Sequence, residues 1–108
     1  MATESIKVSI TPREAQEIVE RYITADLVDT QKFSLGEGRE VYISIYERYF
    51  FRSSNRAALT ITFDNVYGET NVKIVSTGSS QGVIFNFDWG AASSFVGEAI
   101  RALDRYRI

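Results

Sequence analysis

The sequence predicts an α+β fold: an antiparallel sheet of about five to six strands with two helices on one of its faces. Segments that alternate apolar and polar residues fill the middle of the chain, and short polar or glycine-containing turns separate them. Amphipathic helical patterns lie on either side of this block. The predicted order is β-α-β-β-β-β-β-α, a two-layer sandwich in a single domain over residues 1–108, a length that suits one hydrophobic core.

The N-terminal part is predicted to form a short strand and a helix. Apolar and polar residues alternate from residue 5 to residue 10, which is typical of a half-buried strand. Thr11 can then cap a helix, Pro12 suits the first helical position, and Glu14 stands where a capping box places its carboxylate. The apolar spacing predicts that this helix runs over residues 12–25.

The next two strands are predicted to form a hairpin. The glycine-rich stretch Gly36–Gly38 is a three-residue turn between two apolar patterns. This turn would pair Leu35 with Arg39 and Phe33 with Val41, which keeps apolar residues opposite one another.

The longest strand-like run, residues 41–51, is predicted to be a central strand with two different faces. The face predicted to point to the core consists of Val41, Ile43 and Ile45. The face predicted to be uncovered consists of Tyr42, Ser44 and Tyr46. This assignment of faces determines whether the loop that follows must be odd or even in length.

The following strand, residues 57–64, has a clear core face of Leu59, Ile61 and Phe63. Because side chains alternate between faces with a period of two, the two core faces match only if the connecting loop is odd in length. A loop over residues 52–56 would satisfy this requirement, and so would a bulge near Glu47 and Arg48.

The remaining elements follow the same logic. A tight turn over residues 66–69 would pair Phe63 with Val72 and Ile61 with Ile74, again on one face. A last strand is predicted over residues 82–87, and Asp88 is the expected N-cap of a second amphipathic helix.

The composition excludes several classes of function. A net charge of −2 and a pI near 5.1 argue against binding to nucleic acids or to anionic membranes. No apolar run reaches the roughly 18–20 residues that span a bilayer, and no signal peptide is recognisable, so a cytoplasmic location is expected. The chain has no Cys and no His, which excludes zinc sites and Ser-His or Cys-His nucleophiles. We therefore expect no metal, no cofactor and no catalytic residue.

Several short motifs resemble those of a known family. They are residues 46–49 (Tyr-Glu-Arg-Tyr), residues 55–56 (Asn-Arg), residues 77–81 (Thr-Gly-Ser-Ser-Gln) and the phenylalanine-rich run into residues 88–90 (Asp-Trp-Gly). Together they resemble a bacterial family of small single-domain proteins of unknown function, from about Leu35 to the C-terminus. The resemblance implies a bacterial, cytosolic protein. The family pattern is expected to carry a second glycine at the position of Ser79, and the resemblance implies no activity.

Two groups of residues are candidate binding sites. The first is a mixed aromatic and cationic surface on the predicted uncovered face, formed by Tyr42, Tyr46, Arg48 and Lys73. Tyr and Arg are enriched in interface hot spots, although aromatic residues also pack across strands in ordinary sheets. The second is a hydroxyl-rich loop that could form an anion-binding nest or a plain hairpin tip; its residues are Thr77, Gly78, Ser79, Ser80 and Gln81.

Glu47 is predicted to point to the core side and therefore to need a cationic partner. Arg56 is the better candidate, because Arg48 points the other way on the same strand. We interpret Glu47 and Arg56 as a structural ion pair. The alternative is an acid/base carboxylate beside a cation.

Three functions remain open. The first is a non-enzymatic interaction module that self-associates, or docks an unidentified protein, through the exposed sheet face. The second is a protein that binds a small apolar or anionic ligand. The third is an enzyme that uses Glu47, an arginine and the loop over residues 77–81, and it requires Glu47 and Ser79 to converge.

Overall fold

A computed structural model describes residues 2–51, 55–78 and 89–108, and for residues 50, 55 and 89–93 only the backbone. It confirms the α+β fold, with a five-stranded antiparallel sheet and two helices. The predicted strand over residues 82–87 and the predicted cap at Asp88 lie outside the described residues. The elements are β1 Ala2–Val8, α1 Pro12–Tyr22, β2 Asp26–Gly36, β3 Arg39–Phe50, β4 Asn55–Asp64, β5 Thr70–Gly78, α2 Trp89–Leu103 and a 3₁₀ turn, η2 Asp104–Tyr106.

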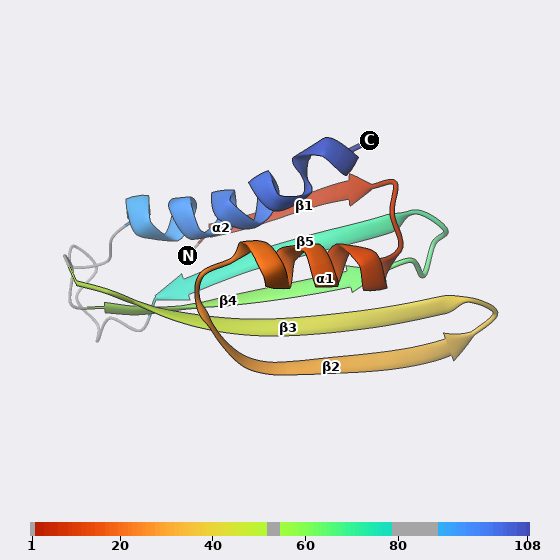
Figure 1. Cartoon of the computed structure of the whole chain (residues 1–108), viewed down its shortest axis with the longest axis horizontal. Coiled ribbons are helices and arrows are strands. Elements are labelled where there is room, and N and C mark those ends of the chain that lie inside the picture. Colours follow the sequence, from red (N-terminus) through yellow and green to blue (C-terminus); the bar gives the residue numbers. More distant parts are fainter. Residues whose placement is uncertain (1, 52–54, 79–88) are drawn as a thin grey trace.

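The strands lie in the order β1-β5-β4-β3-β2, so β4 is central and β1 and β2 are the two edges (Figure 1). Both helices lie against the same face of this sheet. The helix α1 packs over β3, β4 and β5, and α2 packs over β5 and β1. Every residue of β2 is exposed.

The start of α1 agrees with the prediction. The Oγ1 atom of Thr11 accepts a hydrogen bond from the Glu14 backbone N–H at 3.1 Å, and the Glu14 carboxylate accepts one from the Thr11 backbone N–H at 3.0 Å. This reciprocal capping box satisfies backbone donors that have no partner inside the helix. The helix ends at Tyr22, earlier than predicted, because Ile23 already has an extended backbone.

The predicted hairpin registers are mostly confirmed. Phe33 pairs with Val41, and in the β4–β5 hairpin Phe63 pairs with Val72. The predicted pairing of Leu35 with Arg39 is wrong. Gly36 takes that position, and the register shifts between Ser34 and Gly36, which leaves Leu35 as the extra residue of a bulge.

The predicted core face of β3 is also wrong. Tyr42 pairs with Phe63, and Tyr46 pairs with Leu59, so the tyrosines share the helix-covered face with the core residues of β4. Ser44 lies between them, fully buried opposite Ile61. The side chains predicted to form the core, Val41, Ile43 and Ile45, lie on the opposite face and are only half-buried.

The length of the β3–β4 connection explains this reversal. Phe50 pairs with Asn55, so four residues separate the paired positions, and no bulge interrupts the ladder. An even connection places the even-numbered residues of β3 beside the odd-numbered residues of β4. Leu59, Ile61 and Phe63 lie in the core. Tyr42 and Tyr46 pair with residues of this set, so they lie on the same face of the sheet.

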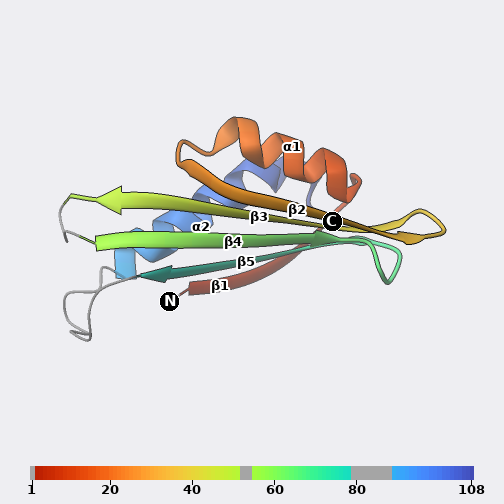
Figure 2. The ribbon, with the colours of Figure 1, turned by 90° about the horizontal axis from the view of Figure 1, so that it is seen from below.

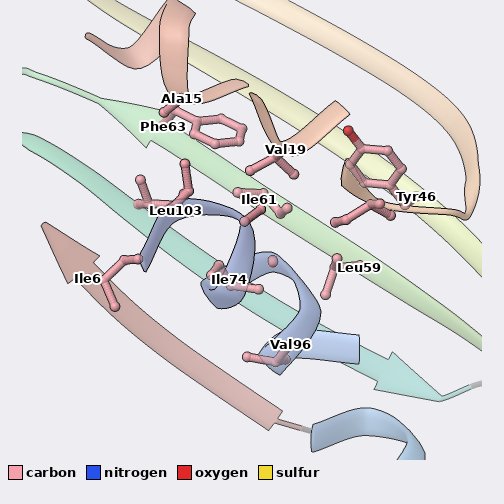
Figure 3. Close-up of a cluster of buried hydrophobic side chains, with 14 of the residues drawn as sticks. Ile6, Ala15, Val19, Tyr46, Leu59, Ile61, Phe63, Ile74, Val96 and Leu103 are labelled. Atoms are coloured by element: carbon pink, nitrogen blue, oxygen red, sulfur yellow. The ribbon is translucent and has the colours of Figure 1, made fainter. Parts of the chain in front are cut away.

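The core lies between the helices and the covered face of the sheet. Figure 3 shows the ring of Tyr46 beside Val19 of α1, on the side of the sheet where Leu59 and Ile61 also lie. The large side chains of this core that are almost completely buried include Val8, Val19, Tyr46, Leu59, Ile61, Phe63, Val72, Ile74, Phe95 and Leu103.

Candidate interaction surface

The face of the sheet turned away from the helices is the candidate site, and we call it the open face. No helix or strand within residues 2–51, 55–78 and 89–108 packs against it. The strand registers arrange its side chains in rows that cross all five strands. One such row consists of Ser5, Lys73, Thr62, Ile43 and Gln31, and the next consists of Thr3, Val75, Thr60, Ile45 and Asp29.

The middle of the open face is apolar or β-branched and carries few charges. Val41, Ile43 and Ile45 run along β3, and Thr60 and Thr62 lie beside them on β4, all of them half-buried. Side chains of this kind fit the pleated surface of a sheet and suit packing against a second flat surface.

The charges of the open face separate across the sheet. Lys7 lies on β1 and Lys73 on β5, on one side of β4, and Arg56 lies on β4 itself. The carboxylates of Asp26, Asp29 and Glu47 lie on β2 and β3, on the other side. Lys7 pairs with Glu69 and Glu47 pairs with Arg56, so the separation of charge rests on Lys73 on one side and on Asp26 and Asp29 on the other.

Only one of the four residues predicted to form this surface lies on it. Lys73 is exposed on the open face, whereas Tyr42 and Tyr46 are buried on the covered face. Ile43 and Ile45, which the sequence pattern assigns to the core, lie on this surface instead. The signal that could have found them is the connection between β3 and β4: an even loop length reverses both faces of β3.

Tyr46 contributes a buried hydroxyl to the core. The residue is 1% exposed, and its hydroxyl has no hydrogen-bond partner among the described residues. Burial, together with the negative charge of Glu20, raises the pKa of Tyr46 to about 12; the nearby hydroxyl of Ser44 lowers it slightly, but the two do not reach hydrogen-bond geometry. Tyr46 is therefore neutral at physiological pH.

We expect Tyr46→Phe to raise the free energy of unfolding by about 1 kcal/mol, because it removes a buried hydroxyl that lacks a partner. Chemical denaturation with urea measures the change. Tyr49→Phe is the matched control, since Tyr49 is 45% exposed. A loss of stability in Tyr46→Phe would mean that the hydroxyl is hydrogen-bonded.

Arg48 lies on the covered face and joins three elements. Its guanidinium forms two contacts of 2.9 Å with the two carboxylate oxygens of Glu98 on α2. It also donates to the Thr24 backbone oxygen at 3.2 Å and lies 4.5 Å from the ring centroid of Phe95. Burial raises the pKa of Glu98, but hydrogen bonds from Arg48 and from the Thr24 backbone outweigh that effect and lower the pKa below its ordinary value. These contacts indicate a structural role for Arg48.

Glu47 and Arg56 form an ion pair of 3.0 Å on the open face. Glu47 does not point to the core, contrary to the prediction, because the even connection moves it to the other face. Both side chains are largely exposed, at 43% for Glu47 and 64% for Arg56, and a pair of this kind adds little to stability.

The predicted anion loop is described only in part. Thr77 is exposed on the open face at the end of β5, and Gly78 is the last residue of that strand. Ser79, Ser80 and Gln81 lie outside the described residues. Among the residues that the structure describes, no group of three or more His, Cys, Asp or Glu side chains could hold a metal ion.

The fold and its surface define a small α+β domain with one helix-covered face and one open face. The chain belongs to the family of unknown function DUF6054, whose family model matches residues 2–107 and so includes β1 and α1 as well as the later motifs. No curated protein and no solved structure matches the chain. In the described parts of the chain, no helix has the length and apolar character needed to cross a membrane.

Proposed function

We propose that this protein is a non-enzymatic interaction module that self-associates by packing its open face against the open face of a second copy. The observation that carries the proposal is the uncovered apolar stripe of Val41, Ile43 and Ile45 on a sheet whose other face is packed against the helices over β1, β5, β4 and β3. Sheets that pack face to face bury such residues at a spacing of about 10 Å.

The charge distribution supports a second copy as the partner. Because β4 is the central strand, a two-fold axis parallel to β4 would place β1 and β5 of one copy over β2 and β3 of the other. Lys73 of one copy would then face the half that carries Asp26 and Asp29 in its partner. In an isologous dimer this contact between opposite charges occurs twice, and the apolar stripes of both copies are buried between the two sheets.

A charge swap tests the proposal. We expect Lys73→Glu and Asp29→Lys each to weaken association about tenfold, because each places like charges opposite one another. The double variant should regain most of the wild-type affinity, since it restores opposite charges with the signs exchanged. Sedimentation equilibrium over a concentration series measures the dissociation constants.

Glu20→Lys is the matched control, because it changes the same amount of charge on the exposed surface of α1, away from the open face. A wild-type protein that stays monomeric at millimolar concentration would contradict the proposal. So would a double variant that associates no better than either single variant.

A further inference from the structure

The turn ends of the two hairpins form a second surface feature, separate from the open face. The β2–β3 turn and the β4–β5 turn lie next to each other at one end of the sheet (Figure 2). A cleft of about 480 Å³ lies between them. A smaller hollow of about 210 Å³ lies beside it, toward β1. Tyr67 lines both hollows, so it lies where they meet.

Tyr67 is held outward by a rigid support. Its side chain is 97% exposed, so it contributes nothing to the core. The preceding Asn65 fixes the turn: its Oδ1 accepts from the Glu40 backbone N–H at 2.8 Å, and its Nδ2 donates to the Gly38 carbonyl at 3.0 Å. These bonds tie the two turns together. Gly68 then closes the turn with a bond to the Asn65 carbonyl at 3.0 Å.

The opposite wall of the cleft carries an unfavourable backbone conformation. Glu37 has a φ of 56°, in the left-handed region, between two glycines that also have positive φ. A glycine would suit this position better, because a side chain there costs about 1 kcal/mol. The chain nevertheless places a carboxylate at Glu37 and a guanidinium at Arg39, both on the cleft wall.

Both hollows beside Tyr67 carry acidic and basic side chains. The larger cleft has Glu37 as an acceptor and Arg39 as a donor. The smaller hollow has Lys7 and Glu69, which form an ion pair of 3.3 Å, together with Asp64. The formal charges cancel in the larger cleft and leave only −1 in the smaller hollow, so neither a phosphorylated ligand nor a cation is strongly attracted. The site therefore favours an uncharged ligand that offers donors and acceptors together.

We infer that the two hollows around Tyr67 form a binding site for a neutral oligosaccharide. A sugar ring has an apolar C–H surface that can stack on an exposed aromatic ring, and hydroxyls that both donate and accept hydrogen bonds. Carboxylate and guanidinium groups are planar and can bind neighbouring hydroxyls in pairs. The position of Tyr67 between the hollows fits a chain of sugars that lies across the ring, with a residue on each side.

The probes are chitotetraose, maltotetraose and cellotetraose, and the measurement is an NMR titration of the ¹⁵N-labelled protein. We expect one of them to shift the amide signals of Gly38, Tyr67 and Gly68, with a dissociation constant on the order of 1 mM, as suits a shallow and open site. Tyr67→Ala should weaken that binding at least about tenfold, because it removes the stacking surface.

Two further variants separate recognition from folding. Glu37→Gly removes the carboxylate and relieves the left-handed strain, so it should weaken binding about fivefold without lowering the unfolding temperature. Tyr49→Ala is the matched control, since Tyr49 is an exposed tyrosine on β3 that lines neither hollow, and it should bind like the wild type. If none of the three saccharides shifts these signals at 10 mM, about ten times the expected dissociation constant, or if both tyrosine variants bind equally, the assignment is wrong. Shifts produced only by a charged probe such as inorganic phosphate would also overturn it.

Discussion

Replacing Arg48 by methionine should lower the free energy of unfolding by about 3 kcal/mol. The substitution keeps an unbranched apolar stem but removes the guanidinium, and it leaves the carboxylate of Glu98 without the two contacts from Arg48. The side chains of Arg48 and Glu98 are only 20% and 15% exposed, so water replaces the lost contacts poorly. Urea denaturation monitored by circular dichroism measures the change.

The chain offers a matched control for this prediction. Arg13 and Glu17 form an ion pair of 3.6 Å on the outer surface of α1, where both side chains are largely exposed. Arg13→Met should therefore lower the free energy of unfolding by less than about 0.5 kcal/mol. The double variant Arg48→Met with Glu98→Met should recover part of the loss, because no unpaired charge remains. Equal losses in Arg48→Met and Arg13→Met would show that the Arg48 contacts do not hold the helices to the sheet.

The ion pair of Arg48 and Glu98 also predicts that the free energy of unfolding depends on pH. The folded protein lowers the pKa of Glu98, so this carboxylate stabilises the fold above its ordinary pKa. That contribution is lost as the pH falls through the lowered pKa of the folded state. In Arg48→Met the guanidinium no longer holds the pKa down. The difference in stability between the wild type and Arg48→Met should therefore shrink in acid and be largest near neutral pH.

Replacing Ile43 by lysine should weaken self-association at least about 100-fold. Ile43 lies in the middle of the open face, between Thr62 on β4 and Gln31 on β2. In the proposed two-fold arrangement, the new cation would be buried against Lys73 of the second copy, where it finds neither water nor an anion. Sedimentation equilibrium of the variant measures the change in the dissociation constant.

Thr30→Lys is the control for this prediction, because it adds the same charge nearby but on the opposite face of the sheet. Thr30 lies on β2 opposite Ser44, on the side of the helices, and it is exposed. This variant should associate like the wild type, and both variants should remain folded by circular dichroism. If Ile43→Lys associates as well as Thr30→Lys, the open face is not the contact surface.

The sequence predicts those elements whose signals are local. The capping box at Thr11 and Glu14 needs only four residues, and it forms as expected. The registers at Phe33–Val41 and Phe63–Val72 follow from short turns between apolar patterns, and the structure has them both. Bulges are harder to predict, because an extra residue such as Leu35 changes the pairing without changing the pattern.

The face of β3 could not be chosen from its own residues. Isoleucine and tyrosine are both found in cores and both favour strands, so the alternation has two acceptable solutions. The choice depends on the register with β4, and therefore on a connection whose length the pattern does not specify. The contact between Arg48 and Glu98 is also invisible in the sequence, because it joins β3 to α2 across 50 residues. The residues of the candidate site differ from the predicted ones for the same reason: the register with β4 decides which side chains of β3 face outward.

The most direct test of self-association through the open face is a dilution series with ¹³C-labelled isoleucine methyl groups. The wild-type protein carries its own controls, because Ile43 and Ile45 lie on the open face while Ile61 and Ile74 are fully buried in the core. We expect the methyl signals of Ile43 and Ile45 to shift with protein concentration and those of Ile61 and Ile74 to stay constant. If the signals of Ile43 and Ile45 also stay constant up to millimolar concentration, the open face is not a contact between copies of this chain.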